Sequence, residues 1–142
     1  MARSRQPDVP STSSPERRSY PSLLIFNSEK LFDPFAFDHA NWQAISGPWG
    51  NGNAPSGVYL VGPRVEIEAG GNNEPFTDAA GLAWWAGLTP KFKTDRTRLG
   101  IHPDGNVPGT RGCIGVTEPI TAACFNWLVE LADPLYLVVL PA

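Results

Sequence analysis

Ile101-His102-Pro103, followed closely by Thr110-Arg111-Gly112-Cys113-Ile114, is the most informative stretch of the sequence. It places one of only two histidines 11 residues before one of only two cysteines. A free thiol has a pKa of about 8.5, so a nucleophilic cysteine needs a neighbouring base or a positive potential at neutral pH. We therefore expect Cys113 to act as a nucleophile with His102 as its base.

The segments around this stretch have the pattern of short strands separated by glycine and proline. A strand that begins near Arg98 and ends at Ile101 would deliver His102 to a sheet edge. Gly62-Pro63 separates two further alternating segments. The predicted strands are Leu23–Phe26, a short strand near Leu31–Phe37 after a turn at 27–30, Gly57–Val61, Arg64–Ile67, 98–101 and the terminal Leu135–Leu140, which we expect to be buried on both faces.

One helix is predicted, over Glu118–Ala132. Thr117 can cap its first turn, and Asp133-Pro134 ends it. Cys124 falls on the apolar stripe, which predicts a packed core thiol. The sequence therefore predicts a β-rich α+β domain with one helix in its C-terminal half. The stripe consists of Ile120, Cys124, Trp127, Leu128 and Leu131.

Length and composition set the domain organisation. The 142 residues suffice for one domain with a substantial core. Residues 1–20 are rich in Pro, Ser and Arg, so we expect a flexible arm ahead of a domain at 21–142. No apolar run is long enough for a membrane span, and the run at Leu23–Phe26 is too short for the core of an export signal.

Charge and ligand spacing exclude further classes. The formal net charge of −3 and the pI near 5.3 argue against a nucleic-acid-binding protein. The two cysteines make no disulfide framework. His39, His102, Cys113 and Cys124 satisfy the count for a zinc site but lack its close spacing, so we expect no metal or other cofactor. His39 has no motif around it and is predicted at the surface.

Basic residues concentrate before Cys113, which indicates either a solvated loop or an anion-binding segment. We expect Arg111, with help from Arg98 or Lys93, to contact an anionic ligand. Trp84 and Trp85 cannot both face the core of one strand, so one of them should lie on the surface or line a cleft. The basic residues are Lys91, Lys93, Arg96, Arg98 and Arg111.

The order of residues excludes several families of cysteine hydrolase. No histidine follows Cys113, so papain-like arrangements, in which the base follows the nucleophile, cannot use this cysteine. No arginine follows it either, which excludes a sortase-like order. A caspase-like Gln-Ala-Cys is absent because Arg111-Gly112 precedes Cys113.

The remaining order resembles the L,D-transpeptidase catalytic domain of the YkuD type. The signature of that family is an Ile-His strand end, then Ser or Thr, any residue, Gly, Cys, and Ile or Val. Here these residues are Ile101-His102 and Thr110–Ile114. Ser46-Gly47, 54–59 and the lead-in 98–103 are also similar, so that the resemblance covers roughly residues 23–140. It implies a curved mixed β-sheet or open barrel packed on the one helix.

The resemblance implies a peptidoglycan-modifying enzyme. Cys113 would attack the bond between meso-diaminopimelate and D-Ala in a stem peptide and form a thioester. His102 would be the base, and the backbone N–H groups of Gly112 and Cys113 would form the oxyanion hole. Thr110, Arg111 and Arg98 are the implied substrate contacts. A second stem, a D-amino acid or water could be the acceptor, which makes the enzyme a transpeptidase, an exchange enzyme or an L,D-carboxypeptidase.

A compact branch with His-Pro in place of His-Gly is most similar, and it includes type VI secretion effectors. A phage wall enzyme fits the same pattern. The implied partners are peptidoglycan stem peptides, with an immunity protein or a secretion or virion component. Synthesis in the cytoplasm without a standard export signal and action on the cell wall, in the periplasm or outside the cell, would follow.

The sequence differs from typical members in two ways. The interval from His102 to Cys113 is shorter, which implies a trimmed loop over the site, and Gly115 stands where many members carry Arg or Asn. Two other readings stay open. One is a catalytically silent wall-binding or virion structural module on the same scaffold, and the other is a cysteine peptidase of unrelated fold.

Overall fold

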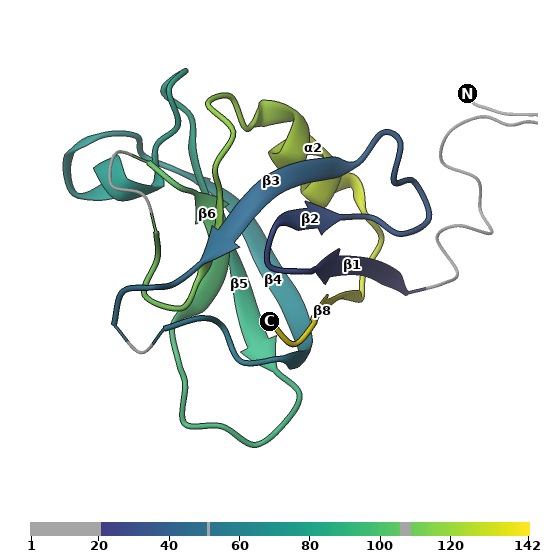
Figure 1. The fold of residues 1–142 in the computed structure, drawn as a ribbon. Coiled ribbons are helices and arrows are strands. Elements are labelled where there is room, and N and C mark those ends of the chain that lie inside the picture. Colours follow the sequence, from purple (N-terminus) through teal and green to yellow (C-terminus); the bar gives the residue numbers. More distant parts are fainter. Residues whose placement is uncertain (1–20, 51, 106–108) are drawn as a thin grey trace, which may run out of the picture.

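The computed structural model describes residues 21–50, 52–105 and 109–142, and the arm predicted at 1–20 lies outside them. The described chain forms a closed β-barrel with an α-helix packed on it (Figure 1). The elements in chain order are β1 (Ser22–Phe26), β2 (Lys30–Phe32), β3 (Asn41–Ser46), β4 (Gly57–Ile67), the 3₁₀ helix η1 (Gly71–Phe76), β5 (Ala83–Pro90), β6 (Leu99–Pro103), β7 (Ile114–Val116), α2 (Ala122–Glu130) and β8 (Leu135–Val139).

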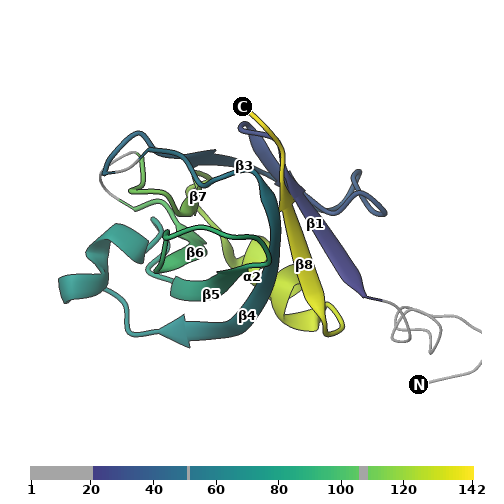
Figure 2. The same cartoon turned by 90° about the horizontal axis from the view of Figure 1, so that it is seen from below.

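The barrel is mixed in strand direction. Its order is β1-β2-β3-β7-β6-β5-β4-β8, and β8 closes on β1. The pairs β1–β8 and β6–β7 are parallel, and the other neighbours are antiparallel. Figure 2 shows the first and last strands side by side. The prediction of a β-rich mixed sheet with one packed helix is confirmed, but the barrel is closed rather than open. Closure removes the sheet edge at which we expected His102, because β6 lies between β5 and β7.

The two segments on either side of Gly62-Pro63 form a single strand. The pairing of β4 with β5 shifts register between Val61 and Arg64. Such a bulge accommodates a proline, which has no N–H to donate to the ladder. The prediction of two separate strands was therefore wrong, because the bulge allows one strand to continue through Gly62-Pro63.

The strand predicted near Leu31–Phe37 is shorter than expected. It ends at Phe32, and a turn follows. The Asp33 carboxylate accepts a hydrogen bond from the Phe35 N–H at 2.9 Å, which is the local turn geometry that Asp favours. The terminal strand β8 alternates buried and half-buried residues, so only one of its faces is fully buried.

Helix α2 begins four residues later than the predicted Glu118. Thr121 stands before its first residue, and both its backbone N–H and its hydroxyl donate to Asp78 Oδ2 at 2.8 Å. These bonds hold the preceding segment against the turn before β5, so Ile120 is 63% exposed instead of joining the apolar stripe. Burial alone would raise the pKa of Asp78, but hydrogen bonds to Leu82, Thr121 and Ala80 outweigh it, and the pKa is lowered.

The core lies inside the barrel and under α2. Trp84 has no exposed surface, stacks on Phe125 at a centroid distance of 5.2 Å and donates its indole N–H to Thr121. Cys124 is fully buried in this core, and burial raises the pKa of its thiol. The prediction of a packed core thiol is confirmed. Among the described residues, no helix has the length and apolar character needed to cross a membrane.

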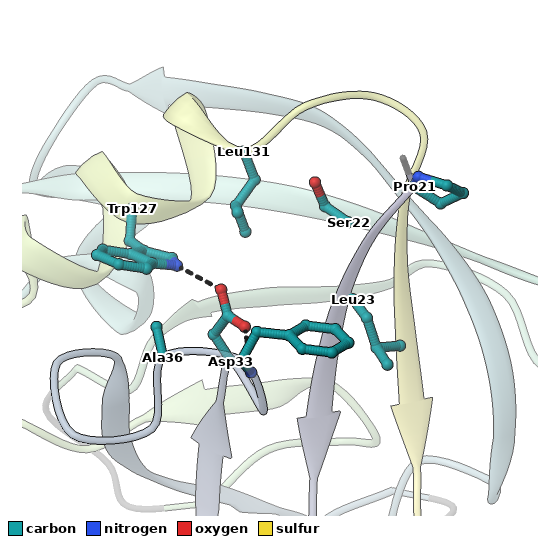
Figure 3. A pocket seen from close by; sticks show the side chains of 8 residues that line it. Pro21, Ser22, Leu23, Asp33, Ala36, Trp127 and Leu131 are labelled. Atoms are coloured by element: carbon teal, nitrogen blue, oxygen red, sulfur yellow. Dashed lines mark hydrogen bonds between the residues drawn. The ribbon is translucent and has the colours of Figure 1, made fainter. Parts of the chain in front are cut away.

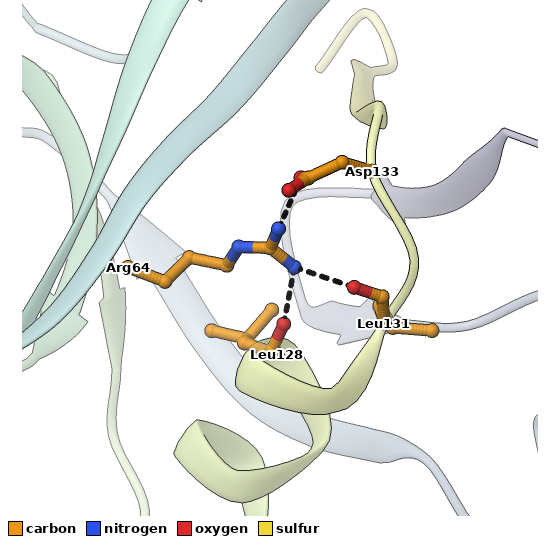
Figure 4. Close-up of polar contacts among 4 residues, drawn as sticks. All are labelled: Arg64, Leu128, Leu131 and Asp133. Atoms are coloured by element: carbon orange, nitrogen blue, oxygen red, sulfur yellow. Dashed lines mark hydrogen bonds and ion pairs between the residues drawn. The ribbon is translucent and has the colours of Figure 1, made fainter.

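Arg64 ties β4 to the end of α2 (Figure 4). Its guanidinium donates to the carbonyls of Leu128 and Leu131 and pairs with the carboxylate of Asp133. The Arg64 side chain is only 10% exposed, whereas that of Asp133 is 78% exposed. The carbonyls at a helix C-terminus have no partners within the helix, and a basic side chain can satisfy them.

We expect Arg64→Met to lower the free energy of unfolding by about 1–3 kcal/mol, because it leaves buried carbonyls without donors. Asp133→Asn should cost no more than about 1 kcal/mol, since an exposed ion pair contributes little. Urea unfolding of both variants measures the difference. Equal losses in the two variants would mean that the ion pair, and not the carbonyl contacts, is the important interaction.

Candidate active site

Strand register brings the backbone segments of His102 and Cys113 together. In the parallel pair β6–β7, Ile101 lies opposite Ile114 and His102 lies opposite Gly115. Ile101 and Ile114 are fully buried in the core, so the residues next to them along each strand face outward. Cys113 directly precedes Ile114. Continued by one residue, this register places Cys113 opposite Gly100, two residues before His102 on β6.

Aromatic side chains build the wall of this site around His102. The indole of Trp85 stacks on the imidazole, with centroids 5.7 Å apart and an interplanar angle of 5°, and Phe76 of η1 meets it edge-on at 4.6 Å. A side chain on Gly100 would collide with the Trp85 ring, so glycine at that position gives the indole its space. The expectation that one of the two tryptophans lies away from the core is confirmed, since Trp85 faces outward while Trp84 is buried.

His102 is held in the tautomer that a general base requires. It is 4% exposed, and its Nδ1 lies 2.6 Å from the Pro103 carbonyl oxygen. A carbonyl oxygen only accepts, so Nδ1 must carry the proton and the lone pair lies on Nε2. Burial lowers the pKa of His102 to about 4, against a smaller raising effect of the Pro103 carbonyl. The imidazole is therefore neutral at pH 7.

The Cys113 thiol contacts a backbone carbonyl. Its Sγ lies 3.6 Å from the Arg98 carbonyl oxygen, and across 21–50, 52–105 and 109–142 no hydrogen bond joins it to His102. Burial raises the thiol pKa, while the Gly100 backbone and the positive charge of Arg96 lower it. Attack requires the sulfur to turn from this carbonyl toward the imidazole. Catalytic hydrogen bonds are often long or misaligned before substrate binds.

Thr110 holds the turn that carries Cys113. Its side chain is buried, and its hydroxyl oxygen accepts from the N–H groups of Gly47 at 3.0 Å and Gly112 at 3.2 Å while the hydroxyl donates to the Cys113 carbonyl. The structure thus gives Thr110 a supporting position inside the turn. The Gly112 N–H is also engaged there, and serving an oxyanion would require it to leave Thr110.

Ser46 supports the same turn from β3. Its hydroxyl donates to the Cys113 carbonyl oxygen at 2.8 Å and accepts from the Ala54 N–H at 2.8 Å. The segments singled out upstream in the sequence, Ser46-Gly47 and 54–59, therefore meet the cysteine turn in space. Their polar groups fix the backbone on both sides of the nucleophile.

Arg96 is the residue of this site that the sequence did not single out. Its guanidinium donates to the carbonyls of Asn53 at 3.3 Å and Arg111 at 3.5 Å, and a side chain on Gly112 would collide with its Nη2. The three predicted anion partners, Arg111, Arg98 and Lys93, are all exposed, whereas Arg96 is half-buried. Five basic residues lie in or near this segment. The paths of the loops bring the guanidinium of Arg96 against the backbone before Cys113.

The burial of His102 can be tested by removing its aromatic cover. Trp85→Ala should raise the pKa of His102 by about 1–2 units, toward the value of a solvated imidazole, because desolvation is the main cause of its lowering. Titration of the imidazole resonances by NMR measures this change. Phe35→Ala, at an exposed position remote from the site, is the matched control. An unchanged pKa in Trp85→Ala would assign the burial to other residues.

A cavity of the described chain lies apart from these residues (Figure 3). It has a volume of about 560 Å³ and contains neither His102 nor Cys113. Its polar feature is Asp33, which accepts a hydrogen bond from the indole of Trp127 at 3.1 Å. We do not take it as the active site, because the Asp33 oxygens are engaged by the Phe35 N–H and the Trp127 indole, and no described hydrogen bond joins this carboxylate to the Ser22 hydroxyl. The lining residues are Pro21, Ser22, Leu23, Asp33, Phe35, Ala36, Trp127 and Leu131.

The other predicted residues lie apart from this site. His39 is exposed, as predicted, and Cys124 is in the core. In the part of the chain that the structure describes, no three His, Cys, Asp or Glu residues are grouped to hold a metal ion. The interval between His102 and Cys113 includes residues 106–108, so the predicted trimmed loop lies partly outside the described residues.

No family model and no curated protein sequence matches the chain.

Proposed function

We propose that the chain is a peptidoglycan-modifying cysteine acyltransferase of the L,D-transpeptidase type. The observation that carries the proposal is the contact of His102 Nδ1 with the Pro103 carbonyl, which leaves the lone pair on Nε2, on a strand that pairs with the segment directly after Cys113. This is the arrangement that a thiol nucleophile with a general base requires. The mixed strand directions and the one packed helix support the L,D-transpeptidase-like identity of the fold, whereas the closure of the barrel differs from the open form that the resemblance implies.

In the first step His102 Nε2 takes the thiol proton, and the Cys113 sulfur attacks the carbonyl carbon between meso-diaminopimelate and D-Ala. The tetrahedral intermediate collapses with cleavage of the C–N bond. D-Ala leaves as an amine that receives the proton from His102, and the acyl group remains as a thioester on Cys113. Backbone N–H groups at Cys113 and Gly112 stabilise the oxyanion once the Gly112 N–H is released from Thr110.

In the second step an acceptor attacks the thioester and frees the thiol. An amine of a second stem gives a cross-link, a free D-amino acid gives exchange, and water gives hydrolysis. The enzyme would act on the cell wall, in the periplasm or outside the cell, as an antibacterial effector or a phage wall enzyme. Its partners would then include an immunity protein or a secretion or virion component.

Incubation with purified muropeptides tests the proposal. Mass spectrometry should detect loss of D-Ala from tetrapeptide stems, a swapped terminal residue or a dimer, and each product identifies one acceptor. Cys113→Ala should give none of them, whereas Cys124→Ala should retain the activity of whatever fraction remains folded. Stems that stay unchanged with folded wild-type protein contradict the proposal, and cleavage of ordinary L,L-peptides instead would indicate a peptidase.

A second candidate is a catalytically silent wall-binding or virion module on the same scaffold. The contact of the Cys113 thiol with the Arg98 carbonyl and the raised pKa of this thiol favour it. Thiol labelling separates the two candidates. An enzyme should have a fast-reacting Cys113 whose rate falls in His102→Ala, whereas a silent module should have an inert thiol in both proteins.

A further inference from the structure

Arg96 lies outside the sequence motif but contacts the backbone directly before Cys113. It lies in the loop between β5 and β6, and its guanidinium lies against the backbone of Gly112, the residue before Cys113. Two carbonyls, those of Asn53 and Arg111, accept long hydrogen bonds from it. Arg96 therefore ties the loop before β4 and the cysteine turn to the loop before β6.

The charge of this guanidinium is not neutralised within the described chain. The ion pair found between described side chains is that of Arg64 with Asp133, and no described carboxylate pairs with Arg96. A guanidinium has five N–H donors, and the two carbonyl contacts leave others for a ligand. Its side chain is half-buried, so a bound anion would be only partly screened by water.

We propose that Arg96 holds a carboxylate of the acyl donor beside Cys113. The inference rests on the proposed function and identifies the cation that orients the substrate. A planar guanidinium matches a carboxylate in a two-point contact, and stem peptides carry carboxylates next to the bond that Cys113 attacks. Gly112 is required here for a second reason besides its φ of +121°, since any side chain would displace Arg96.

The titratable and charged groups in the neighbourhood of Cys113 come from several elements. Arg96 contributes a positive charge from the loop, and the neutral His102 contributes none at pH 7. The carboxyl of Asp104, which packs over Gly115, has a pKa raised by burial. Arg98 and Arg111 flank the site with exposed side chains. The proposal singles out Arg96 from these cations, because its guanidinium alone lies against the Gly112 backbone.

Alkylation of Cys113 by a neutral and an anionic probe tests this assignment without a peptidoglycan substrate. The rates at which iodoacetamide and iodoacetate alkylate Cys113 are to be measured by mass spectrometry across a pH series. Cys124 has no exposed surface and should stay unlabelled. In Arg96→Gln, the rate with iodoacetate relative to iodoacetamide should fall by about fivefold, as expected for the loss of a partly exposed charge pair.

Arg96→Lys keeps the charge and should keep most of the preference for iodoacetate, which guards against a purely structural effect of Arg96→Gln on the loops. Lys91→Gln, an exposed basic residue of the same segment, is the matched charge control. Three outcomes overturn the assignment: an equal change with both probes in Arg96→Gln, a loss of preference in Arg96→Lys as large as in Arg96→Gln, or a larger loss of preference in Arg111→Gln.

The results also separate this inference from the proposed function. Wild-type protein that releases D-Ala but has no Arg96-dependent preference for iodoacetate would leave the enzyme intact and remove the anion site. The opposite result, an Arg96-dependent preference without any muropeptide product, would remove the proposed substrate and keep a cationic site at a reactive thiol.

Discussion

His102→Gln is expected to lower the rate of D-Ala release from tetrapeptide stems by about 10²–10⁴-fold, the usual contribution of a positioned general base. Glutamine retains hydrogen-bonding capacity but cannot take up the thiol proton. The effect should be on turnover, because the imidazole is covered by the stacked indole of Trp85 and the edge-on ring of Phe76 and has little surface with which to bind substrate. Steady-state kinetics with a purified disaccharide tetrapeptide measures it.

The other histidine provides the control. His39 is exposed and lies apart from the site, so His39→Gln should react at the wild-type rate. Circular dichroism should confirm that both variants are folded. A folded His102→Gln protein with a rate within twofold of wild type would remove the base from the mechanism.

The second large effect is on stability as a function of pH. His102 has a pKa of about 4 in the folded chain, against about 6.5 in an unfolded chain. Between these values the unfolded state binds more protons, so the free energy of unfolding rises with pH and falls as acid is added. We expect a loss of about 3 kcal/mol on going from pH 7 to pH 4, with the largest slope inside this window.

Urea unfolding at a series of pH values measures this dependence, and His102→Gln isolates the contribution of the imidazole. Two carboxyl groups with shifted pKa values affect the pH dependence of stability differently. The raised pKa of Asp104 opposes the effect at mildly acidic pH, and the lowered pKa of Asp78 destabilises the fold only below the ordinary carboxyl range. A pH slope that is the same in wild type and His102→Gln would show that this imidazole is not buried in its neutral form.

Local sequence pattern predicted the first and last strands closely, but it predicted no strand at β3, β5 or β7. Leu23–Phe26 is within one residue of β1, and the predicted terminal strand is within one residue of β8. The pattern did not predict features that depend on contacts between residues far apart in the sequence. The start of α2 is set by Asp78, which lies more than 40 residues earlier in the chain, and barrel closure depends on the parallel pairing of the first and last strands. No window of sequence contains these contacts.

The same distinction between local pattern and distant contacts applies to the candidate site. The motif predicts His102 and Cys113 in one region, and the structure places His102 on β6 and Cys113 directly before the paired strand β7. The assignment of their catalytic roles stays a prediction. The tautomer of His102 and the approach of Arg96 could not be derived from the sequence, because they depend on the Pro103 carbonyl and on the path of the loop before β6.

The most direct measurement is the intact mass of the protein after brief incubation with a disaccharide tetrapeptide and acid quenching. The proposed mechanism predicts a mass increase equal to the donor without its D-Ala, located by peptide mapping on Cys113 and missing in Cys113→Ala. If the thiol is alkylated rapidly by iodoacetamide and yet neither the adduct nor free D-Ala forms, Cys113 is a reactive cysteine that does not acylate on peptidoglycan stems.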